Sequence, residues 1–279
     1  MNSTTPSMFF SFILLFAISF SACDFKNDTI SKQNSTTPLK QAAIKQNSSK
    51  VIHVFVALCD NINQGIVKVP AKIGNGQDPV NNLYWGAAYG VKSYFKKQSD
   101  WKLIKSWKQS TIILERCLFK HKTENVYLIA DAYDGASIQQ ATINFLKSCS
   151  GTFDDVLNGT DTLYAGGNAN LIAFIGHDGL MDFNLPQKFP QANTNKREAI
   201  ILACISKRYF YNHLKPTGAV PLLRSNGLMS PEAYTLKAAI DGWIKKESSE
   251  QIRIRPAAAY HQYQKCGMNG ARNLLVTGW

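Results

Sequence analysis

The sequence predicts an α/β domain in which a mostly parallel β-sheet is covered by helices on both faces. Three observations support this fold class. Several short apolar runs are typical of buried strands, segments with helical spacing separate them, and both kinds lie in one stretch after residue 50. Apolar strands that alternate with helices are typical of parallel sheets buried on both sides. We therefore expect a three-layer α/β/α sandwich over residues 51–279.

Five segments are expected to form the core strands, because each is short and apolar, and the first of them is rich in Val. They are VIHVFVALCD (51–60), VYLIADAYDG (126–135), NLIAFIGHDG (170–179), REAIILACIS (197–206) and AVPLL (219–223). The alternating segment WKLIKSWK (101–108) is typical of an edge strand.

Four helices are expected between and after these strands. Apolar residues recur at helical spacing over 81–98 and 137–149. Ser230, Pro231 and Glu232 are typical of a helix start, with an N-cap serine, a proline at the first position and an acid in the first turn. That helix is expected to reach about Lys246, and a last one to cover 257–275.

The first 22 residues have the pattern of a signal peptide. Residues 8–22 (MFFSFILLFAISFSA) are apolar and uncharged, and they are shorter than the roughly 20 residues of a membrane-spanning helix. The stretch ends in Ser21-Ala22-Cys23, which resembles the lipobox of bacterial lipoproteins. The resemblance implies that Cys23 is acylated and becomes the new N-terminus. The alternative is an ordinary signal peptide that is cut after Ala22.

Residues 23–50 are expected to be a flexible tether, because Ser, Thr, Asn, Gln and Lys dominate them. A lipid-anchored tether predicts a location in the cell envelope, at the periplasmic or outer-membrane face. The alternative signal peptide predicts a secreted protein. The expected contact with a membrane is through the N-terminal lipid.

The charge is strongly basic, with 31 Lys and Arg against 19 Asp and Glu and a formal net charge of +12. The basic residues are scattered and do not gather in one segment, which favours a solvated basic face. Nucleic acid is therefore not the expected partner.

Six cysteines lie far apart and form no CxxC pair or other metal-type cluster. A metal site is therefore not expected. If Cys23 carries a lipid, five cysteines remain, and an odd number leaves at least one free thiol in an exported protein. The remaining five are Cys59, Cys117, Cys149, Cys204 and Cys266.

Two successive core strands end in residues that can act together in nucleophilic catalysis. The segment LIAFIG leads to His177, and AIILA leads to Cys204. Ligands of parallel sheets bind beyond the carboxyl ends of the strands, so both side chains are expected at one rim. An imidazole near a cysteine can take its proton and later protonate the leaving amine.

These motifs resemble the caspase-like cysteine peptidases, a group that includes legumain, gingipain, clostripain, separase and the caspases. The family has one hydrophobic strand that ends in His-Gly and another that ends in Ala-Cys or Ser-Cys; the counterparts here are IGHDG and ILAC. The resemblance implies a caspase-like fold, a catalytic dyad of His177 and Cys204, and an oxyanion hole made by Gly179 and the Cys204 backbone. It also implies a peptide or protein substrate and no cofactor.

The sequence departs from the family because Asp178 stands between the histidine and the glycine, and the interval from His177 to Cys204 is short. Asp178 can orient His177 or contact the substrate. Asp60 and Asp131, which are expected at strand ends, are further acidic candidates for substrate binding and would favour a Lys or Arg side chain.

Two readings of function therefore stay open. The first is a cysteine endopeptidase of the bacterial envelope. The second is a non-catalytic envelope lipoprotein that uses the same fold to bind a protein or glycan. A serine hydrolase acting on cell-wall or lipid esters lacks support, because the sequence contains no G-x-S-x-G motif.

Overall fold

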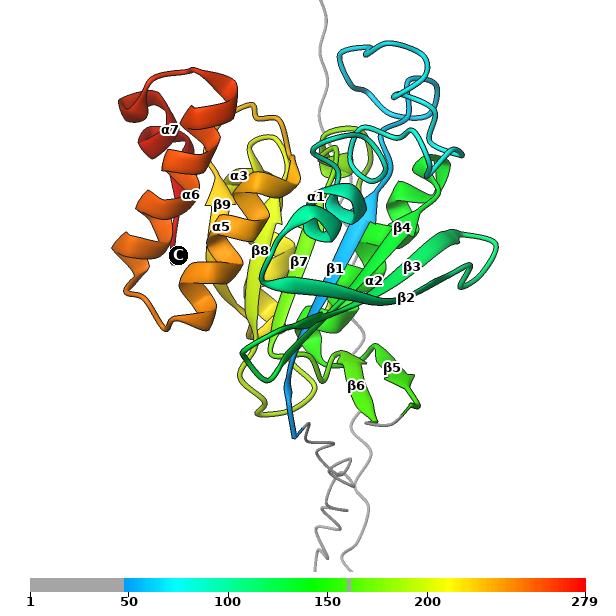
Figure 1. The fold of residues 1–279 in the computed structure, drawn as a ribbon, viewed down its shortest axis with the longest axis vertical. Coiled ribbons are helices and arrows are strands. Elements are labelled where there is room, and N and C mark those ends of the chain that lie inside the picture. The colour runs from blue at the N-terminus through cyan, green and yellow to red at the C-terminus, as the bar shows by residue number, and fades with distance from the viewer. Residues whose placement is uncertain (1–47, 160–161) are drawn as a thin grey trace, which may run out of the picture. The chain divides into compact units, whose positions relative to one another are not determined.

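An eight-stranded sheet organises the protein, and its five central strands run parallel (Figure 1). The computed structural model describes residues 48–159 and 162–279. The strand order is β10-β9-β8-β7-β1-β4-β3-β2, where β2, β3 and β10 are antiparallel to their neighbours. The bounds are β1 Lys50–Ala57, β2 Trp101–Trp107, β3 Ile113–His121, β4 Val126–Tyr133, β7 Leu171–Ile175, β8 Glu198–Leu202, β9 Val220–Ser225 and β10 Leu275–Val276. A separate hairpin joins β5 (Asp154–Leu157) and β6 (Leu163–Gly166).

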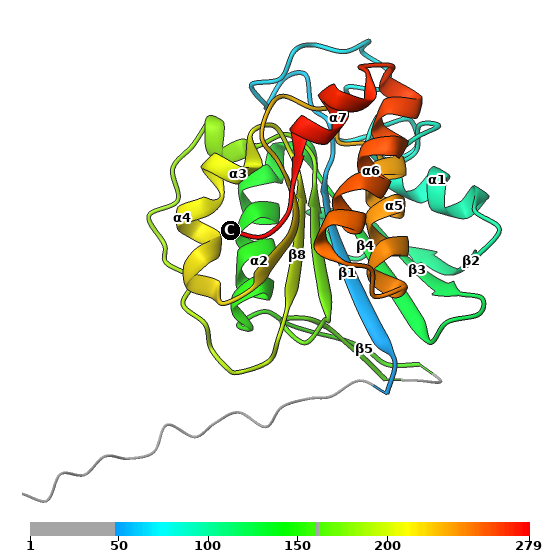
Figure 2. The same cartoon turned by 90° about the vertical axis from the view of Figure 1, so that its left-hand side faces the viewer.

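Helices cover both faces of the sheet, as the two views show (Figures 1 and 2). One face carries α2 (Ile138–Ser150), α3 (Ser206–Tyr209) and α4 (Tyr211–Leu214). The other carries α1 (Val91–Lys97), α5 (Ala233–Ile244), α6 (Ser249–Gln264) and α7 (Met268–Leu274). The expected α/β class with a mostly parallel, two-sided sheet is confirmed.

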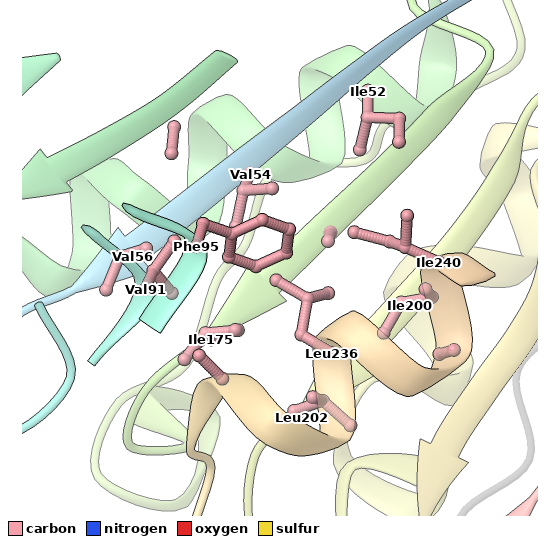
Figure 3. Packing of buried hydrophobic residues seen from close by; sticks show 14 of the residues in the cluster. Ile52, Val54, Val56, Val91, Phe95, Ile175, Ile200, Leu202, Leu236 and Ile240 are labelled. Carbon is pink, nitrogen blue, oxygen red and sulfur yellow. The ribbon is translucent and has the colours of Figure 1, made fainter. Parts of the chain in front are cut away.

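A hydrophobic core lies on each face of the sheet, and these two cores explain why the sequences of the central strands are nearly continuous apolar runs. Successive side chains of a strand point to opposite faces. On β1, Ile52, Val54 and Val56 pack with Phe95 and Leu236 (Figure 3). The intervening residues Val51, Phe55 and Ala57 belong to the second core, beneath α2. Both faces of β1 are therefore buried, which accounts for its mostly apolar sequence; its one polar residue within these cores, His53, is buried as well.

Several boundaries differ from the sequence-based expectations. The segment 81–90 forms turns, and only 91–97 is helical. The helix expected from Ser230 begins at Ala233, with Glu232 as an N-cap whose side chain makes no capping bond. The helix expected over 257–275 is two helices, because the chain turns sharply at Lys265 and Gly267, both with positive φ. Strand β3 was not expected, since its charged residues interrupt the apolar pattern.

Candidate active site

His177 and Cys204 lie at equivalent positions beyond two neighbouring strands. In the parallel pairing of β7 with β8, Ile175 is the register partner of Leu202. His177 and Cys204 each follow two residues later, at the carboxyl edge of the sheet. Both line a single cavity of about 610 Å³ between the segment 65–84 and the start of α5. The structure therefore brings the two expected catalytic side chains to one solvent-accessible site.

Gly176 sets the position of His177. Its φ of 147° is one that L-residues with a side chain rarely adopt. A Cβ at this position would lie 2.8 Å from the carbonyl oxygen of Ala57 on the neighbouring strand β1. Only glycine lets the chain leave β7 here, so the turn that carries His177 depends on it.

Asp182 orients the imidazole, which the sequence reading missed. The His177 Nε2 lies 2.7 Å from Asp182 Oδ2. The same carboxylate accepts a hydrogen bond of 2.9 Å from the Gly65 amide. This bond links Asp182 to the long segment 58–90 that follows β1. A carboxylate at Nε2 favours the tautomer with its proton on that nitrogen. The Nδ1 atom of His177, which has no partner within the described residues, is then the proton acceptor.

Cys204 sits in a strained turn between β8 and α3. Ile205, the next residue, has φ 51° and ψ 30°, in the left-handed region that β-branched residues avoid. Such strain costs on the order of 1–3 kcal/mol and is found at functional sites where the surroundings enforce it. Here the Ile205 amide donates to the Gly227 carbonyl at 2.9 Å. The backbone beside the thiol is thus held in a conformation that local preference would not select.

Two buried serines hold this turn against β9. Ser206 and Ser225 exchange backbone-to-hydroxyl hydrogen bonds of 3.1 and 3.0 Å. The Ser225 hydroxyl also donates to the Ala203 carbonyl, and the Ser206 hydroxyl donates to that of Ile201 at 2.9 Å. Since all these groups are buried, each bond satisfies a polar group that would otherwise be orphaned. The turn is therefore fixed from both sides of Cys204.

The thiol rests on the backbone of Met229. Sγ accepts the Met229 amide at 3.4 Å and lies 3.5 Å from its carbonyl oxygen, to which it can donate. Burial raises the pKa of Cys204, the hydrogen bond from Met229 opposes this, and the charge of Asp178 raises the pKa further. No hydrogen bond joins Cys204 to His177 within residues 48–159 and 162–279. The resting thiol is therefore protonated at neutral pH, and a proton acceptor is needed to activate it.

The other cysteines of the described segments are poorer candidates for a nucleophile. Cys59, Cys117 and Cys149 are fully buried, and Cys266 is exposed outside the cavity. Cys59 also follows a strand, yet burial raises its thiol pKa to about 11. Cys204 alone of these five lines the cavity.

The backbone N–H of Cys204 is available to a developing oxyanion, because it has no hydrogen-bond partner among the described residues. The expectation for Gly179 is different: its amide already donates to the His177 carbonyl at 3.1 Å. A Cβ on Gly179 would lie 2.5 Å from the Phe183 ring. A side chain there would displace the Phe183 ring, and the Gly179 amide is not free as an oxyanion donor.

Asp178 is buried next to the dyad and does not line the cavity. Its Oδ1 accepts the Leu180 amide at 3.1 Å, whereas Oδ2 has no hydrogen-bond partner among the described residues. Burial raises its pKa to about 7, and the neighbouring charge of Asp182 adds to this shift. The structure thus differs from the expectation of a substrate contact: Asp178 is a buried acid that acts on Cys204 through its charge.

Asp178→Asn is expected to stabilise the protein above neutral pH. A carboxyl whose folded pKa is raised favours folding while protonated and loses that advantage as the pH rises from about 4 through 7. At about pH 8 the variant should gain roughly 1–4 kcal/mol of unfolding free energy, and at about pH 4, where the carboxyl is about half protonated in the unfolded chain too, less than about 0.5 kcal/mol. Urea denaturation at both pH values measures this. An equal change at both would contradict an ionised, uncompensated Asp178. The same variant should also lower the pKa of the Cys204 thiol.

Asp60 lies just beyond the end of β1, as expected, but other groups of the protein already donate hydrogen bonds to its carboxylate. It accepts hydrogen bonds from the Ile62 and Asn63 amides and from the Asn63 and Gln77 side chains. Burial acts to raise the pKa of Asp60, and these bonds outweigh it, so the pKa is lowered. Asp60 therefore shapes the segment that follows β1 and does not line the cavity.

Asp131 lies inside β4 rather than at its end, and it is fully buried. Arg116 contacts it through two hydrogen bonds of 2.5 and 2.6 Å, and also contacts Asp155 on the β5–β6 hairpin. His53 accepts the Gly166 amide at Nδ1, so its Nε2 donates to Asp131 at 3.0 Å. The expected role in substrate binding is wrong for Asp131, because no part of it reaches the cavity.

The side chains of His53, Asp131 and Asp155 also offer ligand atoms within 4.8 Å of one another, a spacing that suits a metal ion. Arg116 already supplies the positive charge between the two carboxylates. The group is therefore a closed ion network that joins β1, β3, β4 and the small hairpin.

Comparisons with protein-family models, curated proteins and solved structures found no match to this chain. The lipidation expected at Cys23 and the tether up to residue 47 lie outside the described residues. In the described part of the chain, none of the helices has both the length and the apolarity needed to cross a membrane.

Proposed function

We propose that this protein is a cysteine endopeptidase with a caspase-like domain, in which Cys204 is the nucleophile and His177 the general base. The observation that carries the proposal is the register of β7 with β8, which puts the two residues at equivalent positions on neighbouring strands, where both line one cavity. The strained Ile205 turn supports it, because strain of this kind accumulates where a side chain must be presented.

The proposed reaction follows from the hydrogen bonds of the site. As a substrate carbonyl approaches, Nδ1 of His177 takes the Cys204 proton, and the S–C bond forms. The Cys204 amide donates to the oxyanion. The imidazolium, which Asp182 holds in place, then protonates the leaving amine, and water hydrolyses the thioester. A raised thiol pKa fits this order, in which the proton leaves the sulfur only when substrate is bound.

The N-terminal segment supports a peptidase held at the bacterial envelope by a lipid on Cys23, with peptides or proteins as substrates.

A second function, binding without catalysis, is favoured by one observation. The Cys204 thiol already makes two hydrogen bonds with the Met229 backbone, one to its carbonyl and one from its amide, and its raised pKa keeps it protonated. A protein that only binds a peptide or glycan in this cavity would show the same resting contacts.

Hydrolysis of an unbiased peptide mixture by the full chain distinguishes the two functions. Cleavage is expected in the wild type and in Cys266→Ala, which removes the exposed thiol, and it should be lost in Cys204→Ala. Mass spectrometry of the products reports the cleaved bonds. Cleavage that persists in Cys204→Ala, or its absence from the folded wild type, would contradict the peptidase.

A further inference from the structure

A second acidic side chain lies in the same cavity as the dyad, and sequence reasoning did not select it for substrate binding. Glu232 precedes α5 and lines the cavity together with His177 and Cys204. We propose that Glu232 recognises a cationic side chain, Lys or Arg, of the peptide that Cys204 attacks. This inference rests on the proposed function and names its substrate class.

The contacts of Glu232 leave one carboxylate oxygen for a ligand. Oε2 accepts the Tyr234 hydroxyl at 2.8 Å and the Gln264 amide at 3.2 Å. Oε1 has no hydrogen-bond partner among the described residues, and no Lys, Arg or His of these residues forms an ion pair with Glu232. The two donors fix the carboxylate in place, so an incoming cation meets a positioned group.

The partial burial of this carboxylate favours a cationic partner. Burial raises the pKa of Glu232, and the bonds from Tyr234 and Gln264 offset only part of that effect. A buried carboxylate without a counter-ion is costly, and a bound ammonium or guanidinium would supply the missing charge. Asp60 and Asp131 lack this property, because their own donors already satisfy them.

The walls of the cavity suit the long methylene stem of such a side chain. Apolar residues share the cavity lining with Glu232, among them Val69, Leu83, Met229 and Pro231. Lys and Arg bury their stems on apolar surface while the charged end seeks a polar partner. Lys68 also belongs to this lining; it is exposed and forms no ion pair with any described residue. Although the chain has a net charge of +12, the Glu232 carboxylate gives this cavity a negatively charged group that can bind a cation.

The test compares peptides that differ only at the residue before the cleaved bond, which is Lys, Arg, norleucine or Glu. For the wild type, kcat/KM is expected to be about 100-fold higher for Lys or Arg than for norleucine, because a site built for a polar group rejects an analogue that leaves it unpaired. In Glu232→Gln, the Lys and Arg values should fall by about 10–100-fold. The norleucine value should change less than about threefold.

Glu124→Gln is the matched control, because it removes an equal charge from an exposed residue before β4, at the opposite edge of the sheet. It should leave all four rates unchanged. A wild type that prefers norleucine or Glu, or a Glu232→Gln variant that keeps the Lys preference, would overturn the inference while the peptidase stands. If no peptide is cleaved and Cys204 is never modified, the proposed function fails instead.

Discussion

Replacing His177 with Ala is expected to lower kcat/KM for peptide hydrolysis by about 10²–10⁴-fold, the usual contribution of a positioned general base. The physical reason is the state of the thiol: burial raises the pKa of Cys204, so little thiolate exists at neutral pH without an acceptor. Hydroxide can replace that acceptor, so the remaining activity of the variant should rise with pH. Initial rates measured from about pH 5 to pH 9 report both effects.

Two further variants test whether a loss of activity in His177→Ala comes from losing the general base. Asp182→Asn should retain more activity than His177→Ala, because the amide still contacts the imidazole but no longer stabilises its charge. As a positioning residue, Asp182 should alter the pH profile as well as the rate. His213→Ala, on α4 at the other face of the sheet, is the matched control and should behave as the wild type. An unchanged rate in His177→Ala would contradict the assigned base.

Arg116→Met is expected to lower the free energy of unfolding by about 3–5 kcal/mol, the largest stability effect anticipated for this chain. The variant leaves the carboxylate of Asp131 fully buried without its bidentate partner. Burial acts to raise the pKa of Asp131, and in the wild type the bonds from Arg116 and His53 outweigh it, so the pKa is lowered. Urea denaturation near pH 7 measures the loss.

The pH dependence of stability and a double variant test whether the unpaired charge of Asp131 causes the loss in Arg116→Met. Because the folded pKa of Asp131 is depressed, its contribution is present above the unfolded value of about 3.9 and is lost as the pH falls through the folded pKa. The difference between wild type and Arg116→Met should therefore shrink in acid. Arg116→Met/Asp131→Asn should recover part of the stability, since the buried charge is gone. A loss below about 1 kcal/mol in the single variant would contradict the account.

The sequence was sufficient to predict the central strands and the placement of His177 and Cys204 at one edge of the sheet, for a physical reason. Strands buried on both faces are mostly apolar, so β1, β4, β7 and β8 were visible as runs rich in Val, Ile, Leu and Ala, even though β1 and β4 contain the buried polar residues His53 and Asp131. Polar residues that end such runs fall at the carboxyl edge, which located His177 and Cys204. His177 and Cys204 each follow the paired residues Ile175 and Leu202 by two positions. That equivalence depends on the pairing register of the two strands, which could not be predicted from the sequence.

The partners of the dyad depended on turns and long-range contacts that no local pattern encodes. Asp182 follows His177 by five residues, and only the short turn at 179–181 folds it back onto the imidazole. Glu232 had a local interpretation as an acid in a first helical turn, and it reaches the cavity because α5 starts later than expected. Asp131 was misread as a strand-end residue, since its buried partner Arg116 lies on β3, a strand that the apolar pattern did not indicate.

The most direct measurement is covalent trapping of the nucleophile in the full-length protein. A set of peptidyl acyloxymethyl ketones, with varied residues next to the reactive carbon, captures a cysteine that attacks a bound peptide and releases the carboxylate. Peptide mapping by mass spectrometry then identifies the modified residue. The account predicts a thioether on Cys204 in the wild type that is strongly reduced in His177→Ala, with Cys266 unmodified. Equal labelling of Cys204 in both proteins, or labelling confined to Cys266, would contradict it.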